Sequence, residues 1–358
     1  MMRRKDLQHF DIAGVLPVWK EVGPTSHDVV DMVRRAARIR QVGHTGTLDP
    51  AAEGLLVLCL GPYTKLVPYL TDTDKVYRGW FAFGVETDTD DSDGKPIAVA
   101  DASGVDEARV REAAARFVGE IEQIPPRFSA VKVGGKKLYE YARAEQEVAV
   151  EPRRVRIDRF EIGRVKPLEL PQDFVERARQ NPAVAQEFER LLGTFRQVEF
   201  EVAVSSGTYV RSVARDLGRA LGCGGFLLRL ARVATGAFRA EQAMPMEALA
   251  SMTPEKLDEH LVRGVAVLDR AKYPIFRILP AYLPRLQKGQ PLTDRMVEEM
   301  EEAAKVPNDA VCAIADDVGG LLAMVRAIRF DALQRKNAYP AGHRVGFRPL
   351  RIFPNGLR

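Results

Sequence analysis

Apolar runs and alternating patterns predict several strands in the first two thirds of the chain. The run LLVLCL at residues 55–60 is apolar throughout, which is typical of a strand buried on both faces. Residues 75–85 alternate between two sets of side chains, as the residues of a strand do. Further strands are predicted at residues 14–19, 198–206 and 226–234.

Apolar residues at helical spacing predict helices between these strands. Ser26, followed by Asp28 in the first turn, suits the start of the first helix. Its apolar face consists of Val29, Val30, Val33, Ala36 and Ala37. Residues 106–117 form an amphipathic pattern, and residues 245–268 are helical and close the large domain.

The pattern changes twice, which divides the chain. Residues 165–197 are mostly polar and helical with three proline breaks, and we interpret them as an insertion between two strands. From about residue 271 the chain predicts short strands, at 310–315, at 321–327 and near the end. We therefore expect a domain of residues 1–268 and a small β-rich module of residues 271–358.

Composition fits a soluble globular protein of this size. The chain has 358 residues, of which 46% are hydrophobic and 28% charged. No apolar run approaches the roughly 20 residues that span a bilayer, and no apolar segment follows the basic start to form a secretion signal. The three cysteines lie far apart and form no metal-ligand spacing, so we expect a cytoplasmic protein without structural zinc.

Charge is distributed unevenly although the net charge is only +4. Residues 208–239 hold six arginines and one acid, and residues 344–358 hold four arginines and no acid, whereas residues 86–93 are strongly acidic. Separated patches of opposite sign favour a polyanionic partner on one face. Ordinary solvated faces are the alternative.

The acidic stretch at residues 86–94 also raises the possibility of calcium binding. Its spacing fails the pattern of a calcium-binding helix–loop–helix, because no glutamate follows at the required distance. We therefore expect no metal, and interpret the stretch as a structural or RNA-adjacent loop.

The segment GHTGTLDP at residues 43–50 is the candidate for chemistry. Gly43 and Gly46 permit backbone angles closed to other residues, and Pro50 restricts Asp49 to an extended conformation. Asp49 is thus a carboxylate on a stiff loop, anchored by the strand that follows. The alternative is an ordinary aspartate-proline turn whose carboxylate only accepts backbone hydrogen bonds.

The longer string GHTGTLDPAAEGLLVLCLG, residues 43–61, closely resembles the catalytic segment of the TruB-type pseudouridine synthases, which isomerise a uridine in the T-loop of tRNA. The resemblance implies an α+β fold, with a mixed, largely antiparallel sheet, flanking helices and a β-rich C-terminal RNA-binding domain of PUA type. A generic β appendage is the alternative for that last part. Glu21 stands where the family usually has a proline, which affects only the stiffness of that turn.

Further matches to the family carry roles over to single residues. Asp49 is the expected nucleophile, and Arg211 of the run GTYVR is expected to pair with it and keep it ionised. Tyr77 of the lysine-x-tyrosine run is expected to stack on the base, and Tyr209 and Leu230 to shape the uracil pocket. Taken alone, Tyr77 could be a core aromatic and Arg211 a surface arginine.

Base flipping and RNA contacts complete the expectation. His44 is expected to fill the space that the uridine leaves in the T-loop. We expect Lys20, Lys65, Lys132 and Arg143 to contact RNA; the last two belong to a basic and aromatic run for which simple solubility is the alternative. The implied partner is the T-stem-loop of tRNA, bound by a monomer without cofactor or metal.

Several questions stay open at this point. Asp49 could attack uracil C6 or ribose C1′, or act after a glycal-type step. A non-catalytic RNA-binding or tRNA-folding module is the rival from another class of function. A synthase of the same fold that acts on a different RNA is the second rival.

Overall fold

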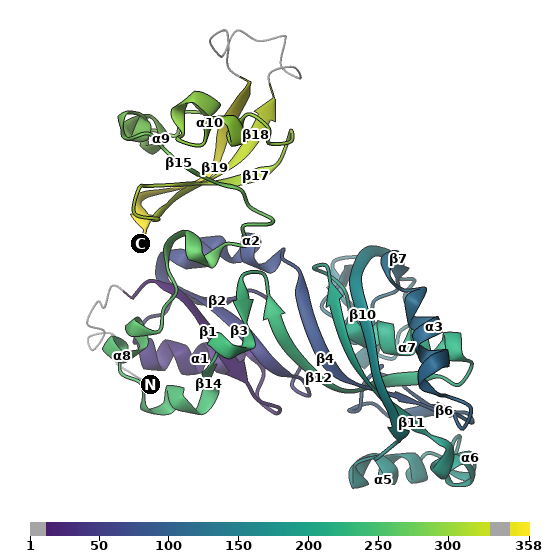
Figure 1. Ribbon diagram of the computed structural model, residues 1–358. Helices are drawn as coiled ribbons and strands as arrows, with labels where there is room; N and C mark the ends of the chain where they lie inside the picture. Colours follow the sequence, from purple (N-terminus) through teal and green to yellow (C-terminus); the bar gives the residue numbers. More distant parts are fainter. Residues whose placement is uncertain (1–11, 330–343) are drawn as a thin grey trace.

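The computed structural model describes residues 12–329 and 344–358. These residues form an α+β fold with one large mixed sheet and a smaller C-terminal β-rich part (Figure 1). The predicted fold class is therefore confirmed.

The large sheet has the strand order β14-β1-β3-β12-β4-β11-β10-β7, with β2 paired to β3 and β13 to β12. In the described residues, β1–β14 and β3–β12 are parallel, and the other pairs of this sheet are antiparallel. Its strands are β1 (Gly14–Lys20), β2 (Val42–His44), β3 (Glu53–Leu60), β4 (Lys75–Phe83), β7 (Gly119–Gln123), β10 (Arg153–Pro167), β11 (Arg196–Val204), β12 (Gly225–Thr235), β13 (Phe238–Arg239) and β14 (Met244–Pro245).

Two small hairpins project from this sheet, and helices flank it. The hairpins are β5 (Val85–Thr87) with β6 (Pro96–Val99), and β8 (Lys132–Val133) with β9 (Lys136–Lys137). The helices are α1 (Ser26–Ala37), α2 (Val67–Thr71), α3 (Glu107–Ala115), α4 (Leu138–Arg143), α5 (Gln172–Gln180), α6 (Ala185–Leu191), α7 (Val210–Leu221) and α8 (Pro254–Glu259).

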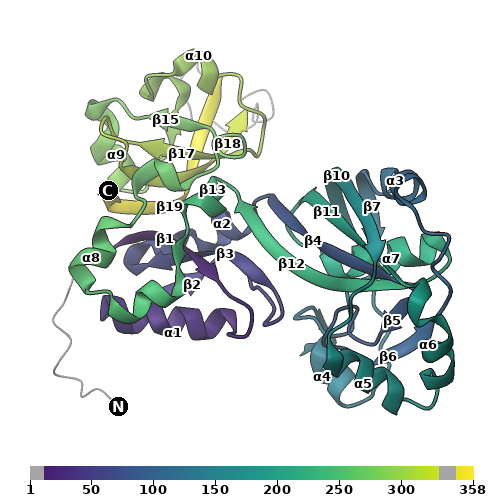
Figure 2. The same cartoon turned by 60° about the horizontal axis from the view of Figure 1, so that its bottom comes forward.

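Strand β3 shows why its apolar run has no polar face. Leu56, Leu58 and Leu60 belong to the main core, which α1 helps to form. The alternate residues, Leu55, Val57 and Cys59, belong to a second cluster that includes residues of the C-terminal part such as Met324 and Phe353. Both faces of β3 are therefore buried, as the run predicts, and the C-terminal part shares a core with the large sheet (Figure 2).

The C-terminal part consists of a five-stranded sheet in the order β15-β17-β18-β19-β16. The predicted strands at 310–315 and 321–327 are present as β17 and β18. The elements are β15 (Ile275–Arg277), α9 (Leu283–Gln287), β16 (Leu292–Thr293), α10 (Met300–Ala303), β17 (Val311–Ala315), β18 (Leu321–Arg329) and β19 (Val345–Leu357).

One prediction about local structure is confirmed and one needs correction. Helix α1 begins at Ser26, as predicted, and Thr25 caps it, since the Thr25 hydroxyl accepts from Asp28 N and the Asp28 carboxylate accepts from Thr25 N. The predicted insertion at 165–197 is helical only in its middle, because β10 continues to Pro167 and β11 begins at Arg196. Helices α5 and α6 fill the interval between these strands.

Candidate active site

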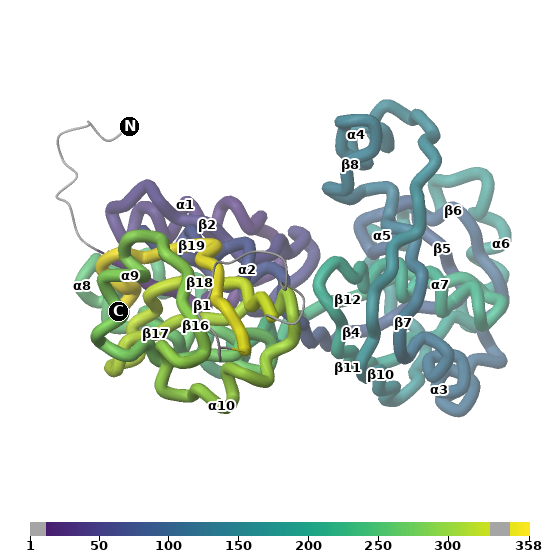
Figure 3. Tube along the Cα trace, turned by 90° about the horizontal axis from the view of Figure 1, so that it is seen from above, coloured from purple at the N-terminus to yellow at the C-terminus, as the bar shows by residue number. Residues whose placement is uncertain are grey.

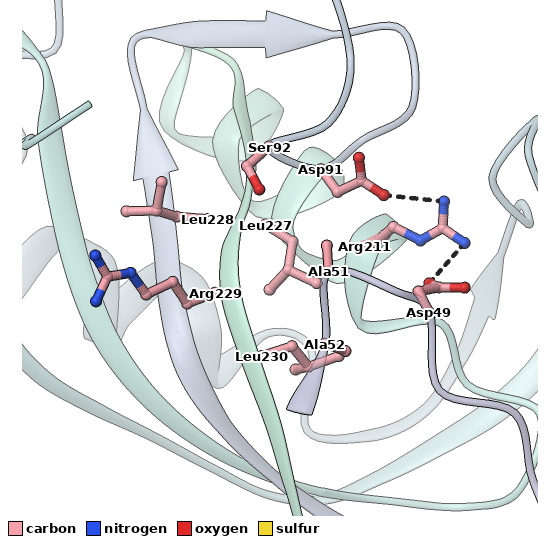
Figure 4. A pocket seen from close by; sticks show the side chains of 10 residues that line it. All are labelled: Asp49, Ala51, Ala52, Asp91, Ser92, Arg211, Leu227, Leu228, Arg229 and Leu230. Atoms are coloured by element: carbon pink, nitrogen blue, oxygen red, sulfur yellow. Dashed lines mark ion pairs between the residues drawn. The ribbon is translucent and has the colours of Figure 1, made fainter. Parts of the chain in front are cut away.

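A narrow pocket opens where four segments of the large sheet and its loops meet (Figure 4). It encloses about 270 Å³, including its open mouth. Its lining comes from the loop before β3, the turn between β5 and β6, helix α7 and strand β12. The lining residues are Asp49, Ala51, Ala52, Asp91, Ser92, Arg211, Leu227, Leu228, Arg229 and Leu230.

Arg211 lies between two carboxylates at this pocket. Its Nη2 is 3.0 Å from Asp49 Oδ2, and its Nη1 is 3.3 Å from Asp91 Oδ2. The same guanidinium donates to Thr89 O and Phe128 O, at 3.2 and 3.1 Å. Asp49 is 47% exposed whereas Arg211 is 9% exposed, so a buried cation with partners on both terminal nitrogens holds a carboxylate that faces solvent.

The acidic turn packs against the arginine face of α7. Arg215 pairs with Asp90 at 2.9 Å, and Arg219 with Glu86 at 3.4 Å. Burial raises the pKa of Asp90 to about 6 and raises that of Asp91 above its ordinary value, while the neighbouring arginines oppose the rise.

This packing corrects the interpretation of the charge pattern. The acidic stretch and the first three arginines of the basic stretch neutralise one another, and do not form separate patches. Arg211 and Arg215 are therefore not free to bind phosphates. Among the described residues, no group of three or more histidine, cysteine or carboxylate side chains is placed to hold a metal ion.

Lys20 and Ser26 hold the loop that carries Asp49. Lys20 is fully buried, and its Nζ donates to Ala52 O at 2.6 Å and to Glu21 O at 2.8 Å. The Ser26 hydroxyl accepts from Leu48 N at 2.8 Å and donates to Leu48 O at 3.0 Å. The prediction that Lys20 contacts RNA is wrong, because its ammonium group is used inside the protein to position the Asp49 loop.

Arg232 is a further support for this loop that sequence reasoning missed. It is 2% exposed, and its guanidinium donates to Leu55 O at 2.8 Å and to Gly46 O at 2.9 Å. An arginine inside a strand gives no sequence signal that its partners are carbonyl groups far away in the chain. Only the parallel pairing of β12 with β3 brings these groups together.

Two predicted site residues, Tyr77 and Tyr209, lie outside the lining of the pocket. Tyr77 on β4 is 8% exposed and belongs to the main core. Tyr209 is the residue before α7, and the buried Gln123 fixes its backbone through two hydrogen bonds, Tyr209 N to Oε1 at 2.8 Å and Nε2 to Tyr209 O at 3.1 Å. Sequence reasoning did not single out Gln123. Leu230, by contrast, lines the pocket together with Asp49.

His44 ends β2 at the start of the loop, and its ring is held in place. Gly46 N donates to His44 Nδ1 at 3.3 Å. Burial lowers the pKa of His44, and the nearby positive charge of Arg232 lowers it further. The imidazole is therefore neutral at neutral pH, with its proton on Nε2.

The remaining predicted RNA contacts are exposed. Lys65 lies on the short 3-10 helix of residues Gly61–Leu66, Lys132 on β8, and Arg143 at the end of α4, with its guanidinium 5.4 Å from the centre of the Tyr139 ring. Figure 3 shows β8 and α4 standing out from the body of the large sheet. In the part of the chain that the structure describes, no helix is long and apolar enough to cross a membrane.

Comparisons with known proteins agree with the geometry. Residues 34–210 match the model of the TruB family pseudouridylate synthase N-terminal domain, and residues 211–274 match that of the tRNA pseudouridylate synthase B C-terminal domain. The chain is 43% identical to tRNA pseudouridine synthase B of Symbiobacterium thermophilum over 70% of its own length and 76% of that protein. It is 33% identical to the Syntrophotalea carbinolica protein of the same name over 96% of its length and 98% of that protein.

A similar fold occurs in solved structures. The protein matched in a crystal structure of a Cbf5-Nop10-Gar1 complex superimposes with a TM-score of 0.64, covering 95% of this chain and 84% of that one. Sequence identity there is 21%, so this likeness concerns the fold alone.

Proposed function

Because the chain belongs to the TruB family of pseudouridylate synthases, we propose that its substrate is uridine 55 in the T-loop of tRNA and that Asp49 is the nucleophile. The reaction is an isomerisation. The bond between uracil N1 and ribose C1′ breaks, a bond between C5 and C1′ forms, C5 loses its hydrogen and N1 gains one. No cofactor or metal is needed for this balance.

The observation that carries the proposal is the pairing of Asp49 with Arg211 at the mouth of a largely apolar pocket. An aspartate can act as a nucleophile only while it is ionised, and a nearby guanidinium favours the ionised form. Arg211 cannot easily move away, since Asp91 and two carbonyl groups hold its other donors. The site thus presents an accessible carboxylate paired with a cation whose position is fixed.

The neighbouring residues have roles that follow from the same proposal. Leu230 contacts the uracil ring in the pocket, and Tyr209 packs beside the start of α7. Tyr77 stacks on the base, which requires the base to reach a side chain that is 8% exposed in the free protein. The neutral ring of His44 fills the space that the flipped uridine vacates, without adding a charge among the stacked bases.

Binding of the T-stem-loop involves exposed cations and the C-terminal part. Lys65, Lys132 and Arg143 contact phosphates, and the β-rich residues 271–358 act as a PUA-like RNA-binding domain beside a catalytic domain of residues 1–268. The enzyme acts as a monomer in the cytoplasm, where tRNA is its substrate.

The test uses tRNA transcripts labelled with [5-³H]uridine. Each conversion at C5 releases tritium to water, so release reports the reaction directly. The proposal predicts release from a natural-sequence transcript and none from a transcript with cytidine at position 55. Release that continues from the cytidine transcript would show a different target position, and no release from either would show a different RNA substrate.

A further inference from the structure

Helices α5 and α6 lie outside the pocket, yet they contact the turn that completes it. We propose that this helical pair is a brace for the acidic turn of residues 88–95, with Arg177 and Asn181 as positioning residues for the isomerisation. The inference rests on the proposed function for its kinetic consequence. Its structural part concerns the protein alone and can be tested separately.

The first support is a pair of hydrogen bonds from the brace to the hairpin β5–β6. Arg177 Nη2 donates to Ser92 O at 2.7 Å, and Asn181 Nδ2 donates to Pro96 O at 2.7 Å. Ser92 lines the pocket next to Asp91. The first bond therefore holds the turn at the residue next to Asp91, and the second holds the start of β6, the strand that follows the turn.

Arg177 is itself fixed before it reaches the turn. Its Nη1 lies 2.6 Å from Asp173 Oδ2, one helical turn earlier. Its guanidinium lies 5.4 Å from the centre of the Phe174 ring, which is fully buried. A side chain held by an ion pair and by a buried ring loses little further freedom when it binds Ser92 O, so it is a suitable support.

The second support is an apolar cluster that joins the brace to strand β12. Phe174 and Phe188 are fully buried, and Phe174 stacks on Phe226 of β12 with ring centres 5.1 Å apart. The same cluster includes Leu228, which also lines the pocket. The brace thus contacts two of the four segments that form the pocket.

These contacts lead to the reacting carboxylate through a short chain of partners. Arg177 holds the turn, the turn places Asp91, and Asp91 pairs with Arg211, which pairs with Asp49. If the turn is free to shift, Arg211 loses one of the two carboxylates that orient it. Asp49 would then keep a charged neighbour but not a fixed one.

Hydrogen–deuterium exchange of the protein alone tests the structural part. We expect Arg177→Met to raise exchange across residues 88–95. Arg179→Met is the matched control, since Arg179 lies on the same helix and forms a 2.6 Å ion pair with Glu189 but, within the described residues, makes no hydrogen bond or ion pair with the turn. Equal exchange in both variants would overturn the brace.

Single-turnover kinetics with tRNA test the catalytic part. Arg177→Met should lower the rate constant about 3- to 30-fold, with an unchanged Kd for tRNA, while Arg179→Met leaves both unchanged. Arg177→Lys keeps one donor for Ser92 O and should restore most of the rate. Equal loss in the two methionine variants, or a loss confined to Kd, would contradict the positioning role.

A double-mutant cycle shows whether the effect passes through Asp91. In an Asp91→Asn background, Arg177→Met should cause little further loss, because the partner that it positions is already disabled. Full additivity would exclude this route. If the wild-type protein leaves tRNA unmodified, the proposed function fails, and the exchange experiment still decides whether the brace exists.

Discussion

A methyl group added at Gly54 should disturb the two buried residues that hold the Asp49 loop. Gly54 pairs with Lys20 on β1 and with Arg232 on β12, so the two buried cations that hold the Asp49 loop flank it. Its φ is +118°, and a Cβ built there would lie 2.4 Å from both Arg232 N and Arg232 O. Gly54→Ala therefore combines an unfavourable backbone angle with a backbone clash.

Alanine at Gly23 would carry the cost of the backbone angle without the clash, so this variant distinguishes the two effects. The φ of Gly23 is +114°, but a Cβ there would have no atom within 4 Å. Gly23→Ala should cost only the backbone term, about 1–3 kcal/mol. In Gly54→Ala, β3 and β12 must also move apart, which weakens the hydrogen bonds of Arg232 to Leu55 O and Gly46 O. Each of these contributes about 1 kcal/mol, so we expect a total of about 3–5 kcal/mol.

Thermal unfolding of the two variants beside the wild type measures the difference. At about 1.3 °C per kcal/mol for a chain of this size, Gly23→Ala should lower the apparent Tm by about 1–4 °C and Gly54→Ala by about 4–7 °C. Gly54→Ala should also lose activity at temperatures where it stays folded, because Arg232 no longer holds Gly46 O. Equal losses of Tm in the two variants would refute the clash and the role assigned to this strand pair.

Two further predictions concern buried and exposed lysines. Lys20→Met should slow modification by up to about 10²-fold while leaving the Kd for tRNA unchanged, since the substitution displaces the Asp49 loop. Lys65→Met should instead weaken tRNA binding and reduce the slope of log Kd against log salt concentration by about one. A Kd change in the first variant but not in the second would contradict this assignment. Burial lowers the pKa of Lys75 to about 8 from 10.5. The folded protein then binds fewer protons than the unfolded chain between these values, so wild-type stability should rise relative to Lys75→Met by about 3 kcal/mol from pH 7.5 to 10.5 in urea unfolding. A difference in unfolding free energy between the wild type and Lys75→Met that does not change with pH would contradict this prediction.

Elements with a strong local pattern could be predicted from the sequence. The apolar run at 55–60 predicted a strand buried on both faces, and the structure supplies a separate hydrophobic cluster for each face. The segment at 43–50 predicted a stiff loop with an anchored carboxylate. The helical middle of residues 165–197 was also predicted, although not that it packs against the turn beside the pocket.

Contacts between distant segments could not be predicted. Lys20 carries the same charge whether it faces solvent or three backbone carbonyl groups, so its burial has no local signal. Arg232 and Asp91 acquire their partners only when β12 pairs with β3 and when the acidic turn packs on α7. The expectation of separate charged patches was wrong for the same reason, because the acidic and basic stretches lie far apart in the sequence and the fold brings them together.

The most direct test of the account is single-turnover tritium release from [5-³H]uridine-labelled tRNA by the wild type and by Asp49→Asn. The account predicts release by the wild type and none by the variant, with equal Kd for tRNA, since the substitution removes the charge and keeps the shape of the side chain. Undiminished release by Asp49→Asn would contradict the assignment of Asp49 as the nucleophile.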